Sequence, residues 1–242
     1  MADPVVVFRD ARLTIGGQRV VGPLRFAVER GETVILLGRS GSGKTTTLRL
    51  ANALLLPSEG EVIVEGRATT AWDPVRLRRS AGYVIQEVGL LPHFTVANNV
   101  SLVPRLERWP AARRTARAAE LLELVGLPPD PYASRYPHQL SGGQRQRVGL
   151  ARALAADPPI LLCDEPFGAV DPVTRRDLQQ EFAALADRLG KTVLFVTHDV
   201  REALALGDRI ALLDDGIVRF LGTPDGFSRS TDPAVQTFRE GS

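Results

Sequence analysis

Short runs of apolar residues, each bounded by glycine or polar residues, recur along this chain of 242 residues. Three runs have the length and composition of buried strands: Thr33–Leu37, residues 159–163 and Thr192–Thr197. Shorter runs predict further strands: residues 5–8, 24–28, 61–64, 81–85, 209–213 and 217–221. We therefore predict an α/β fold, in which the first three of these shorter segments form an antiparallel β subdomain.

Helical periodicity dominates the middle of the chain. The clearest helix spans residues 111–125, and Gly126 is placed to end it. Its apolar residues share one face: Ala118, Leu121, Leu122 and Val125. Further helices are predicted at residues 44–52, 145–156, 173–189 and Val200–Leu206, and a short polar tail is predicted after the last strand. We expect one domain, with a core formed by residues 1–86 and 150–242 and a helical subdomain at residues 87–149.

The composition narrows the classes of protein to which the chain can belong. With 44% hydrophobic residues, the chain can bury a core as one α/β unit. Its formal net charge of +2 gives no reason to expect nucleic acid as a partner. The one cysteine, Cys163, lies in a predicted core strand and has no partner for an internal disulfide, which suits a reducing cytosol. No apolar run approaches the ~20 residues of a membrane-spanning helix, and no signal-peptide pattern opens the chain.

A glycine-rich stretch follows the first buried strand and leads into a predicted helix: Gly38, Arg39, Ser40, Gly41, Ser42, Gly43, Lys44, Thr45 and Thr46. Its spacing is that of a P-loop, whose backbone amides cradle the phosphates of a nucleotide. Lys44 is placed to reach the β- and γ-phosphates, and the Thr45 hydroxyl to bind Mg²⁺. An incidental turn is the alternative, and the strand before it and the helix after it argue against that. The stretch predicts a site for ATP and Mg²⁺.

Two carboxylates stand where the buried strand of residues 159–163 ends. Core packing does not explain Asp164 and Glu165, because unpaired buried charge is costly. At the carboxyl end of a strand in an α/β sheet, acidic side chains face the ligand crevice. Asp164 is therefore predicted to hold Mg²⁺, and Glu165 to act as general base for the attacking water. The alternative is that both acids cap the loop that follows.

A second glycine-rich stretch lies further along the chain: Leu140, Ser141, Gly142, Gly143 and Gln144. It resembles the signature of ATP-binding cassette (ABC) ATPases, in which the signature of one copy meets the P-loop of another across bound ATP. The resemblance implies a P-loop NTPase core of this family and a dimer that closes on two ATP and opens after hydrolysis. From the residues alone, a capping box is the other interpretation, with Ser141 as N-cap and Gln144 three residues later.

The resemblance extends to three more positions, in the order of the family. Gln86 follows an apolar strand and matches the Q-loop glutamine, which touches Mg²⁺ and the attacking water. Asp171 matches the D-loop aspartate that crosses the dimer interface, although it is also placed to cap the helix after it. His198 follows a buried strand and matches the switch histidine that contacts the γ-phosphate. For His93 and His138, which fall in predicted loops, we expect structural or interfacial roles.

Two stretches are similar to the ATPases of glycine betaine/choline/carnitine (osmoprotectant) importers: residues 82–106 and 132–156. This implies a subunit on the cytoplasmic face of the membrane, working as a homodimer or beside a related ATPase. It would power uptake through separate permease subunits, with a solute-binding protein acting indirectly. Importers of amino acids, sulfonates, nitrate or polyamines share much of the pattern and remain alternatives for the solute.

Two other classes of nucleotide-binding protein fit the sequence less well. An ABC ATPase of translation or DNA repair would usually carry a second cassette or a coiled-coil insertion, and neither is seen. A P-loop kinase or GTPase would not need the signature at Leu140. Many osmoprotectant ATPases carry C-terminal CBS domains, for which the residues after the last strand leave no room, so the resemblance does not imply direct osmotic sensing by this chain.

An aliphatic residue near the start of the chain departs from the family pattern, and a basic stretch in the helical region lies outside the motifs. Where ABC ATPases usually stack adenine on an aromatic ring, the chain has Ile15, so we expect weaker discrimination between bases. A basic stretch is interpreted as a solvated helix face, with lipid headgroups as the alternative partner: Arg105, Arg108, Arg113, Arg114 and Arg117.

Overall fold

The computed structural model describes residues 4–86, 89–168 and 170–240. They form two units, Met1–Arg78 with Ala186–Ser242, and Arg79–Leu185. Helices α2 (Pro74–Ser80) and α8 (Pro172–Arg188) cross the boundary between the units. The predicted start of the helical subdomain at residue 87 lies outside the described residues.

The first unit contains an antiparallel sheet with the strand order β2-β1-β4-β5. Its strands are β1 (Pro4–Ile15), β2 (Gln18–Glu29), β4 (Glu59–Val64) and β5 (Arg67–Ala68). The prediction of short strands was wrong for β1 and β2, which have 12 residues each. Their pairing continues through charged positions, where Arg9 faces Arg25 and Arg25 contacts Asp10. Cross-strand pairs of this kind do not register as hydrophobic periodicity, so the sequence pattern covered only part of each strand.

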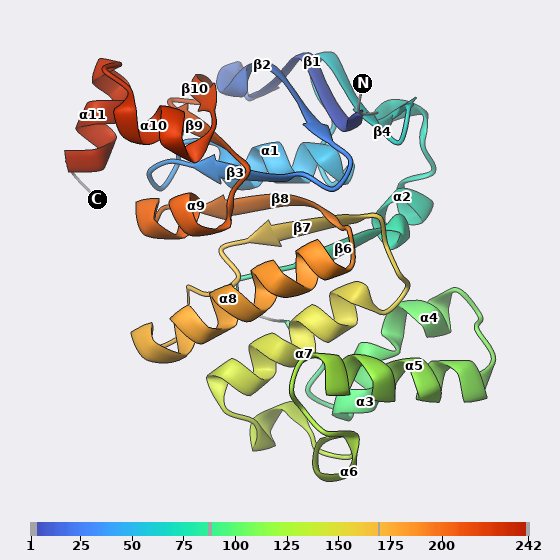
Figure 1. Ribbon diagram of the computed structural model, residues 1–242. Coiled ribbons are helices and arrows are strands. Elements are labelled where there is room, and N and C mark those ends of the chain that lie inside the picture. The colour runs from blue at the N-terminus through green and yellow to red at the C-terminus, as the bar shows by residue number, and fades with distance from the viewer. Residues whose placement is uncertain (1–3, 87–88, 169, 241–242) are drawn as a thin grey trace. The chain divides into compact units, whose positions relative to one another are not determined.

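The remaining strands of this unit form three parallel strands and one antiparallel edge strand (Figure 1). β3 (Thr33–Leu37) pairs in parallel with β8 (Thr192–Thr197) and β9 (Arg209–Asp214), and β9 pairs antiparallel with β10 (Ile217–Gly222). Every residue of β3 and β8 is buried, as predicted for an α/β interior. Helix α1 (Lys44–Ala51) packs on β8 and β4, and α9 (Val200–Leu206) packs on β3 and β8. A 3-10 turn, η1 (Thr69–Ala71), precedes α2.

The end of the chain is helical, so the predicted polar tail was wrong. Helices α10 (Pro224–Arg229) and α11 (Pro233–Glu240) follow β10. Phe227 and Val235 are fully buried, and the ring of Phe227 meets that of Phe220 edge-on at 5.4 Å between centroids. Each helix begins at a proline, which suits the first helical position. Both are too short for their few apolar residues to form a clear period.

The second unit contains a parallel strand pair and most of the helices. β6 (Ala81–Val84) pairs with β7 (Ile160–Asp164), and Cys163 on β7 is buried as predicted. The helices are α3 (Val96–Val100), α4 (Leu102–Leu106), α5 (Ala111–Leu124), α6 (Pro129–Tyr132) and α7 (Gly142–Leu154). Leu121 and Leu122 of α5 are buried, and Gly126 follows with a φ of 70°. The predicted face and end of this helix are therefore confirmed.

The two histidines expected in loops differ in their surroundings. His93 lies in a turn and meets the ring of Phe94 edge-on. His138 lies in the 3-10 helix η2 (Pro137–Gln139), not in a loop, and stacks on Tyr136. Pro137 at the start of η2 sets the backbone for this turn.

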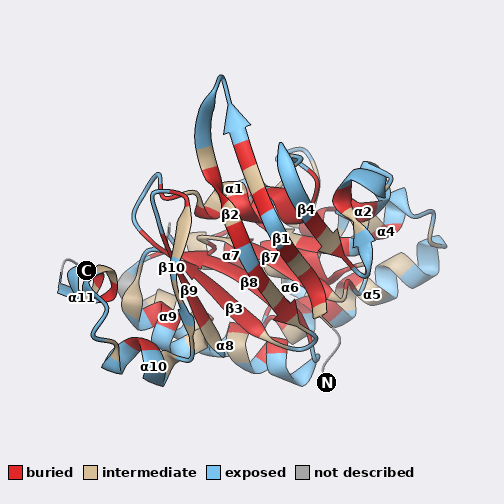
Figure 2. Ribbon diagram, turned by 90° about the horizontal axis from the view of Figure 1, so that it is seen from above, coloured by how far each residue is buried: buried red, intermediate tan, exposed pale blue. Residues whose placement is uncertain are grey.

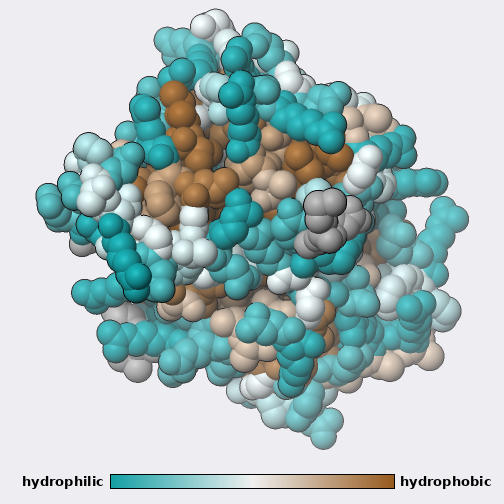
Figure 3. Space-filling model, turned by 45° about the horizontal axis from the view of Figure 1, so that its top comes forward, coloured by the Kyte–Doolittle hydropathy of each residue, from teal (hydrophilic) through white to brown (hydrophobic). Residues whose placement is uncertain are grey.

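Burial separates the strands from the loops. Figure 2 shows β3 and β8 as buried, whereas the turn that joins β1 to β2 is exposed. On the face drawn in Figure 3, hydrophilic residues surround smaller areas of hydrophobic ones. None of the helices that the structure describes is both long and apolar enough to cross a bilayer.

Candidate nucleotide-binding site

The glycine-rich loop joins β3 to α1 in the first unit. A Cβ built on Gly38 would overlap the carbonyl oxygen of Leu213, and one on Gly43 would overlap Cγ1 of Val21. Gly43 also has a φ of 96°, in the left-handed region that favours glycine. The backbone of Leu213 and the side chain of Val21 therefore leave no room for a larger residue at these two positions, and the loop passes close to β2 and to the end of β9.

Lys44 lies across this loop. Its Nζ donates to the carbonyl oxygens of Gly38 at 2.8 Å and Arg39 at 2.9 Å. The residue is only 5% exposed. The ammonium group is therefore held at the loop and away from solvent. The P-loop prediction places it at the loop as well.

Polar groups at the start of α1 fit an anionic ligand. The N-cap residue, Gly43, makes no side-chain cap for the helix amides. The hydroxyl of Ser42 is buried and lacks a hydrogen-bond partner in the part of the chain that the structure describes. Thr45 and Thr46 are half-buried in the first turn. An unpartnered hydroxyl beside the positive end of a helix suits a phosphate group.

The register of the parallel strands brings His198 to the same edge as the glycine-rich loop. Leu37, the last residue of β3, pairs with Thr197, the last residue of β8. Gly38 and His198 are the next residues along these two strands. Asp199 caps α9, because its Oδ1 accepts from the backbone N–H of Arg201 at 2.8 Å. The predicted placement of His198 at the phosphate edge of the sheet agrees with this geometry.

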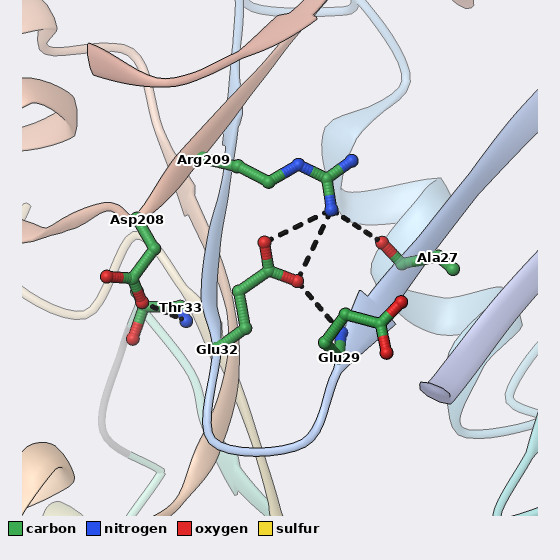
Figure 4. Close-up of polar contacts among 6 residues, drawn as sticks. All are labelled: Ala27, Glu29, Glu32, Thr33, Asp208 and Arg209. Carbon is green, nitrogen blue, oxygen red and sulfur yellow. Dashed lines mark hydrogen bonds and ion pairs between the residues drawn. The ribbon is translucent and has the colours of Figure 1, made fainter. Parts of the chain in front are cut away.

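β3 is anchored at its other end by a nearly buried ion pair (Figure 4). The guanidinium of Arg209 donates to Glu32 at 3.1 Å and to the carbonyl oxygen of Ala27 at 3.2 Å. Glu32 also accepts from the backbone N–H of Glu29 at 2.8 Å, and Asp208 accepts from that of Thr33 at the same distance. These contacts fix the start of the strand that leads into the glycine-rich loop.

The β1–β2 hairpin lies against the glycine-rich loop at one point and reaches solvent at its end. Val21 is the neighbour of Gly43 described above, and the N–H of Gly22 donates to the carbonyl of Gly216 at 2.7 Å. Ile15 stands at the exposed turn of the hairpin and is 57% exposed. The chain thus exposes an aliphatic side chain at the position where ABC ATPases usually carry an aromatic ring.

The second unit brings Gln86, Asp164 and Glu165 together. Val84 on β6 pairs with Cys163 on β7. Gln86, Asp164 and Glu165 come just after this pair along the two strands and therefore lie at the same edge. The Tyr83 hydroxyl lies 3.5 Å from Oδ2 of Asp164. A Cβ built on Gly168 would lie 3.4 Å from Nε2 of Gln86 and 3.5 Å from the carbonyl oxygen of Glu165.

The backbone of Glu165 adopts a left-handed conformation. Its φ is 44°, and its carbonyl accepts from the N–H of Gly168 at 3.1 Å. Such a conformation costs a residue other than glycine about 1–2 kcal/mol and persists where the surroundings hold it. The turn after β7 therefore fixes the backbone at the point where this side chain leaves the strand.

Two residues of α7 that the sequence analysis did not single out contact the segment around Gln86. Nε2 of Gln146 donates to the carbonyl of Gln86 at 3.5 Å, and its Oε1 is buried without a partner among the described residues. Arg152 donates to the carbonyl of Gly89 at 2.7 Å, and burial lowers the pKa of its guanidinium. The signal available in the sequence was a second glutamine, two residues after the signature.

The signature forms a complete capping box at the start of α7. The N–H of Gln144 donates to Oγ of Ser141 at 3.2 Å, and that of Ser141 donates to Oε1 of Gln144 at 2.9 Å. A Cβ on Gly143 would lie 2.9 Å from Cγ2 of Thr174 on α8. The structural interpretation of this stretch is confirmed. The hydroxyl hydrogen of Ser141 is not used in the box and can donate to a ligand.

Asp171 caps α8. Its Oδ1 accepts from the N–H of Thr174 at 3.1 Å, as expected for an N-cap residue. Ala169, in the stretch before it, lies outside the described residues. The predicted site residues thus form two sets: the glycine-rich loop with His198 in the first unit, and Gln86, the two acids, the signature and Asp171 in the second.

The comparisons with known proteins agree with these features. Residues 21–168 match the family described as ABC transporter. The choline transport ATP-binding protein OpuBA of Bacillus subtilis (strain 168) is 50% identical over 224 residues, which are 92% of this chain and 58% of that protein. The glycine betaine uptake system ATP-binding protein YehX of Escherichia coli (strain K12) is 47% identical over 236 residues, which are 98% of this chain and 76% of that protein. The chain therefore spans little more than half the length of OpuBA.

A solved structure shares the fold. The dimeric, post-hydrolysis ATP-binding cassette MJ0796, bound to ADP and Pi, has a TM-score of 0.80 and 36% sequence identity. The likeness covers 90% of this chain and 98% of that one. The α/β fold with a P-loop is therefore that of the ATP-binding cassettes.

Proposed function

The chain belongs to the ABC transporter family, and we propose that it hydrolyses ATP to power solute import through separate membrane permease subunits. The loop between β3 and α1 is the observation that carries this proposal. It combines glycines that have no room for a Cβ, the buried Lys44 and the unpartnered hydroxyl of Ser42. These groups suit the triphosphate of a nucleotide.

Residues of both sets would hold the nucleotide and its metal. The backbone of residues 38–46 would cradle the phosphates, and Lys44 would neutralise the β- and γ-phosphates. The Thr45 hydroxyl, Asp164 and Gln86 would bind Mg²⁺, which when bound neutralises the charge that develops during phosphoryl transfer. Within the described ranges no three His, Cys, Asp or Glu residues gather as a metal site. Mg²⁺ needs no such cage, because it takes many of its ligands from phosphates and water.

Three side chains would act on the attacking water. Glu165 would accept its proton, and its left-handed backbone sets the direction of its Cα–Cβ bond at the end of β7. Gln86, held near the same turn, and His198, at the edge of β8, would orient the water. Positioning of this kind is the main source of catalysis in phosphoryl transfer.

A second copy, or a related ATPase, would complete each site. Ser141, Gly142, Gly143 and Gln144 of that copy would face the γ-phosphate with the Ser141 hydroxyl and the positive end of α7. Asp171 would lie at the interface between the copies. The dimeric structure of MJ0796 supports this arrangement.

The membrane partners and the solute are inferred from relatives. OpuBA and YehX carry names for choline and glycine betaine transport, which supports a quaternary amine as the solute. The chain would dock as a peripheral subunit on the cytoplasmic face of the membrane, beneath permease subunits that receive solute from a binding protein. We propose residues 87–149 as the helical subdomain that passes movement to the permease, and residues 1–86 with 150–242 as the ATPase core.

ATP hydrolysis by the purified chain tests the enzymatic part of the proposal. Replacing Glu165→Gln should lower turnover about 10²–10⁴-fold, because general base catalysis contributes about that factor. The variant should also form a dimer that is stable in ATP. The matched control is Glu123→Gln, since Glu123 is an exposed residue of α5. Wild-type turnover in the Glu165→Gln protein would contradict the assignment of the base.

Uptake in cells tests the solute. Labelled glycine betaine and choline should accumulate in cells that carry the wild-type chain and should not accumulate with Lys44→Ala. Immunoblotting of the variant controls for expression. Unchanged uptake in the variant would overturn the quaternary amine as the solute, and amino acids, sulfonates, nitrate and polyamines would be tested next.

A further inference from the structure

Four arginines lie within ten residues of the sequence, where α4 is followed by α5 in the second unit. We call them the arginine corner: Arg105, Arg108, Arg113 and Arg114. None of the described carboxylates forms an ion pair with these four side chains. Arg105, Arg108 and Arg113 are exposed, and Arg114 is half-buried. The local charge therefore exceeds the formal net charge of +2 of the whole chain.

Neighbouring charges do not cancel this excess. Glu107 is the one acid within residues 105–114, and it pairs with Arg79 at 3.0 Å. In the next turn of α5, Arg117 pairs with Glu120 at 2.7 Å. Each nearby acid thus already has a basic partner, and the four arginines keep their charge toward solvent.

The corner is held in one shape by its backbone. The N–H of Trp109 donates to the carbonyl of Pro104 at 2.9 Å, and that of Arg108 donates to the carbonyl of Arg105 at 3.0 Å. Arg79 adds a donor to the carbonyl of Leu106 at 3.4 Å. The charges are therefore presented on a fixed turn, which lowers the entropy that binding must overcome.

Apolar surface accompanies the charge. Leu106 is 48% exposed, and the guanidinium of Arg113 lies 3.6 Å from the centre of the Trp109 ring. Tryptophan and arginine suit the boundary between an apolar and a polar phase, because each has an apolar body and a polar end. An exposed leucine adds affinity for acyl chains, whereas a nucleic-acid backbone would gain nothing from it.

We propose that the arginine corner binds the phosphate groups of anionic phospholipids in a bilayer, with Leu106 and Trp109 at the headgroup level. The inference rests on the proposed function only for the presence of a membrane near the chain. It assigns to the chain a lipid contact of its own, in addition to any permease. Each arginine near such a surface contributes about a fivefold increase in binding.

Vesicle flotation tests this with the full-length chain. Binding to vesicles of equal parts phosphatidylglycerol and phosphatidylcholine should exceed binding to phosphatidylcholine alone. It should fall as ionic strength rises, because the screening length shortens from about 30 Å at 0.01 M to about 8 Å at 0.15 M. Replacing the four arginines by glutamine should weaken binding at least tenfold, whereas replacing them by lysine should largely preserve it.

The matched control removes the same charge elsewhere. Four other exposed arginines are replaced by glutamine: Arg76, Arg176, Arg188 and Arg219. This protein should keep most of the vesicle binding, and thermal unfolding should show that both glutamine variants remain folded. ATP hydrolysis by the corner variant in solution should equal that of the wild type, so loss of vesicle binding and failure of the ATPase proposal are separate results.

Three outcomes would overturn the inference. The corner variant and the control could lose vesicle binding equally, which would make net charge the cause. The wild type could bind anionic vesicles no better than neutral ones at low salt. The corner variant could lose binding to single-stranded or duplex DNA and not to vesicles, which would assign the corner to a nucleic acid.

Discussion

The ion pair between Glu32 and Arg209 allows the contribution of burial to be measured. Side-chain exposure is 10% for Glu32 and 29% for Arg209. Replacing Glu32→Ala removes the carboxylate from Arg209 and the acceptor from the N–H of Glu29. Breaking a fully buried pair costs about 3–5 kcal/mol, and water at the exposed part of Arg209 reduces this to about 2–3 kcal/mol.

An exposed pair in the same unit provides the control. Arg12 and Glu59 lie closer, at 2.7 Å, but their side chains are 43% and 64% exposed. Solvent screening limits such a pair to about 0.2–1 kcal/mol, so Glu59→Ala should change stability little. If distance decided the strength of the pair, Glu59→Ala would cost more stability than Glu32→Ala. If burial decides it, Glu32→Ala costs more, so the two substitutions distinguish the two explanations.

Urea titration gives the free energy of unfolding, and thermal unfolding gives a second reading. For a chain of this size each 1 kcal/mol lowers Tm by about 2–4 °C, so Glu32→Ala should lower it by about 4–12 °C. The double variant Glu32→Ala, Arg209→Met should lose less than the sum of the single variants, because neither charge remains unpaired. A loss below about 0.5 kcal/mol for Glu32→Ala, or a larger loss for Glu59→Ala, would refute the reasoning.

Three further predictions concern the nucleotide site. Ile15→Tyr should tighten ATP binding, since base stacking on an aromatic ring contributes about 1–3 kcal/mol per base; an unchanged Kd for ATP would contradict this. Gly43→Ala should destabilise the chain more than Gly41→Ala, because both have positive φ but only Gly43 has Val21 in the way; equal losses in urea titration would refute it. Gln146→Leu should lower ATP turnover with the free energy of unfolding changed by less than about 1 kcal/mol, because Oε1 has no partner to lose and Nε2 loses only the long 3.5 Å bond to the carbonyl of Gln86; unchanged turnover would remove Gln146 from the site.

Elements whose local pattern and tertiary environment agree could be predicted from the sequence. Thr33–Leu37 and Thr192–Thr197 were predicted with the observed ends, because every residue faces the interior and the chain turns directly after them. β1 and β2 were predicted too short, because charged residues such as Arg9, Asp10 and Arg19 interrupt the apolar pattern in the parts that were missed. The C-terminal helices were missed because they are too short for their few apolar residues, among them the buried Phe227 and Phe238, to form a clear period.

The same division holds for the candidate site. The glycine-rich loop could be predicted because its spacing is local, and the edge position of His198 follows from parallel strands that end together. The contact of Gln146 with the backbone of Gln86 depends on how α7 packs beside β6, which no local pattern encodes. The roles of these residues in binding and hydrolysis stay predictions until the variants are measured.

The hydrogen bonds of Lys44 have a consequence for the speed of nucleotide exchange. The ammonium already has two carbonyl acceptors in the loop, from Gly38 and Arg39. An arriving phosphate would accept hydrogen bonds from an ammonium group that is already in place. When the phosphate leaves, the ammonium group would donate to the two carbonyls again. Nucleotide binding and release would then exchange the hydrogen-bond acceptors of Lys44 while the loop keeps its conformation. Folding of the loop would therefore not limit the rate of either step.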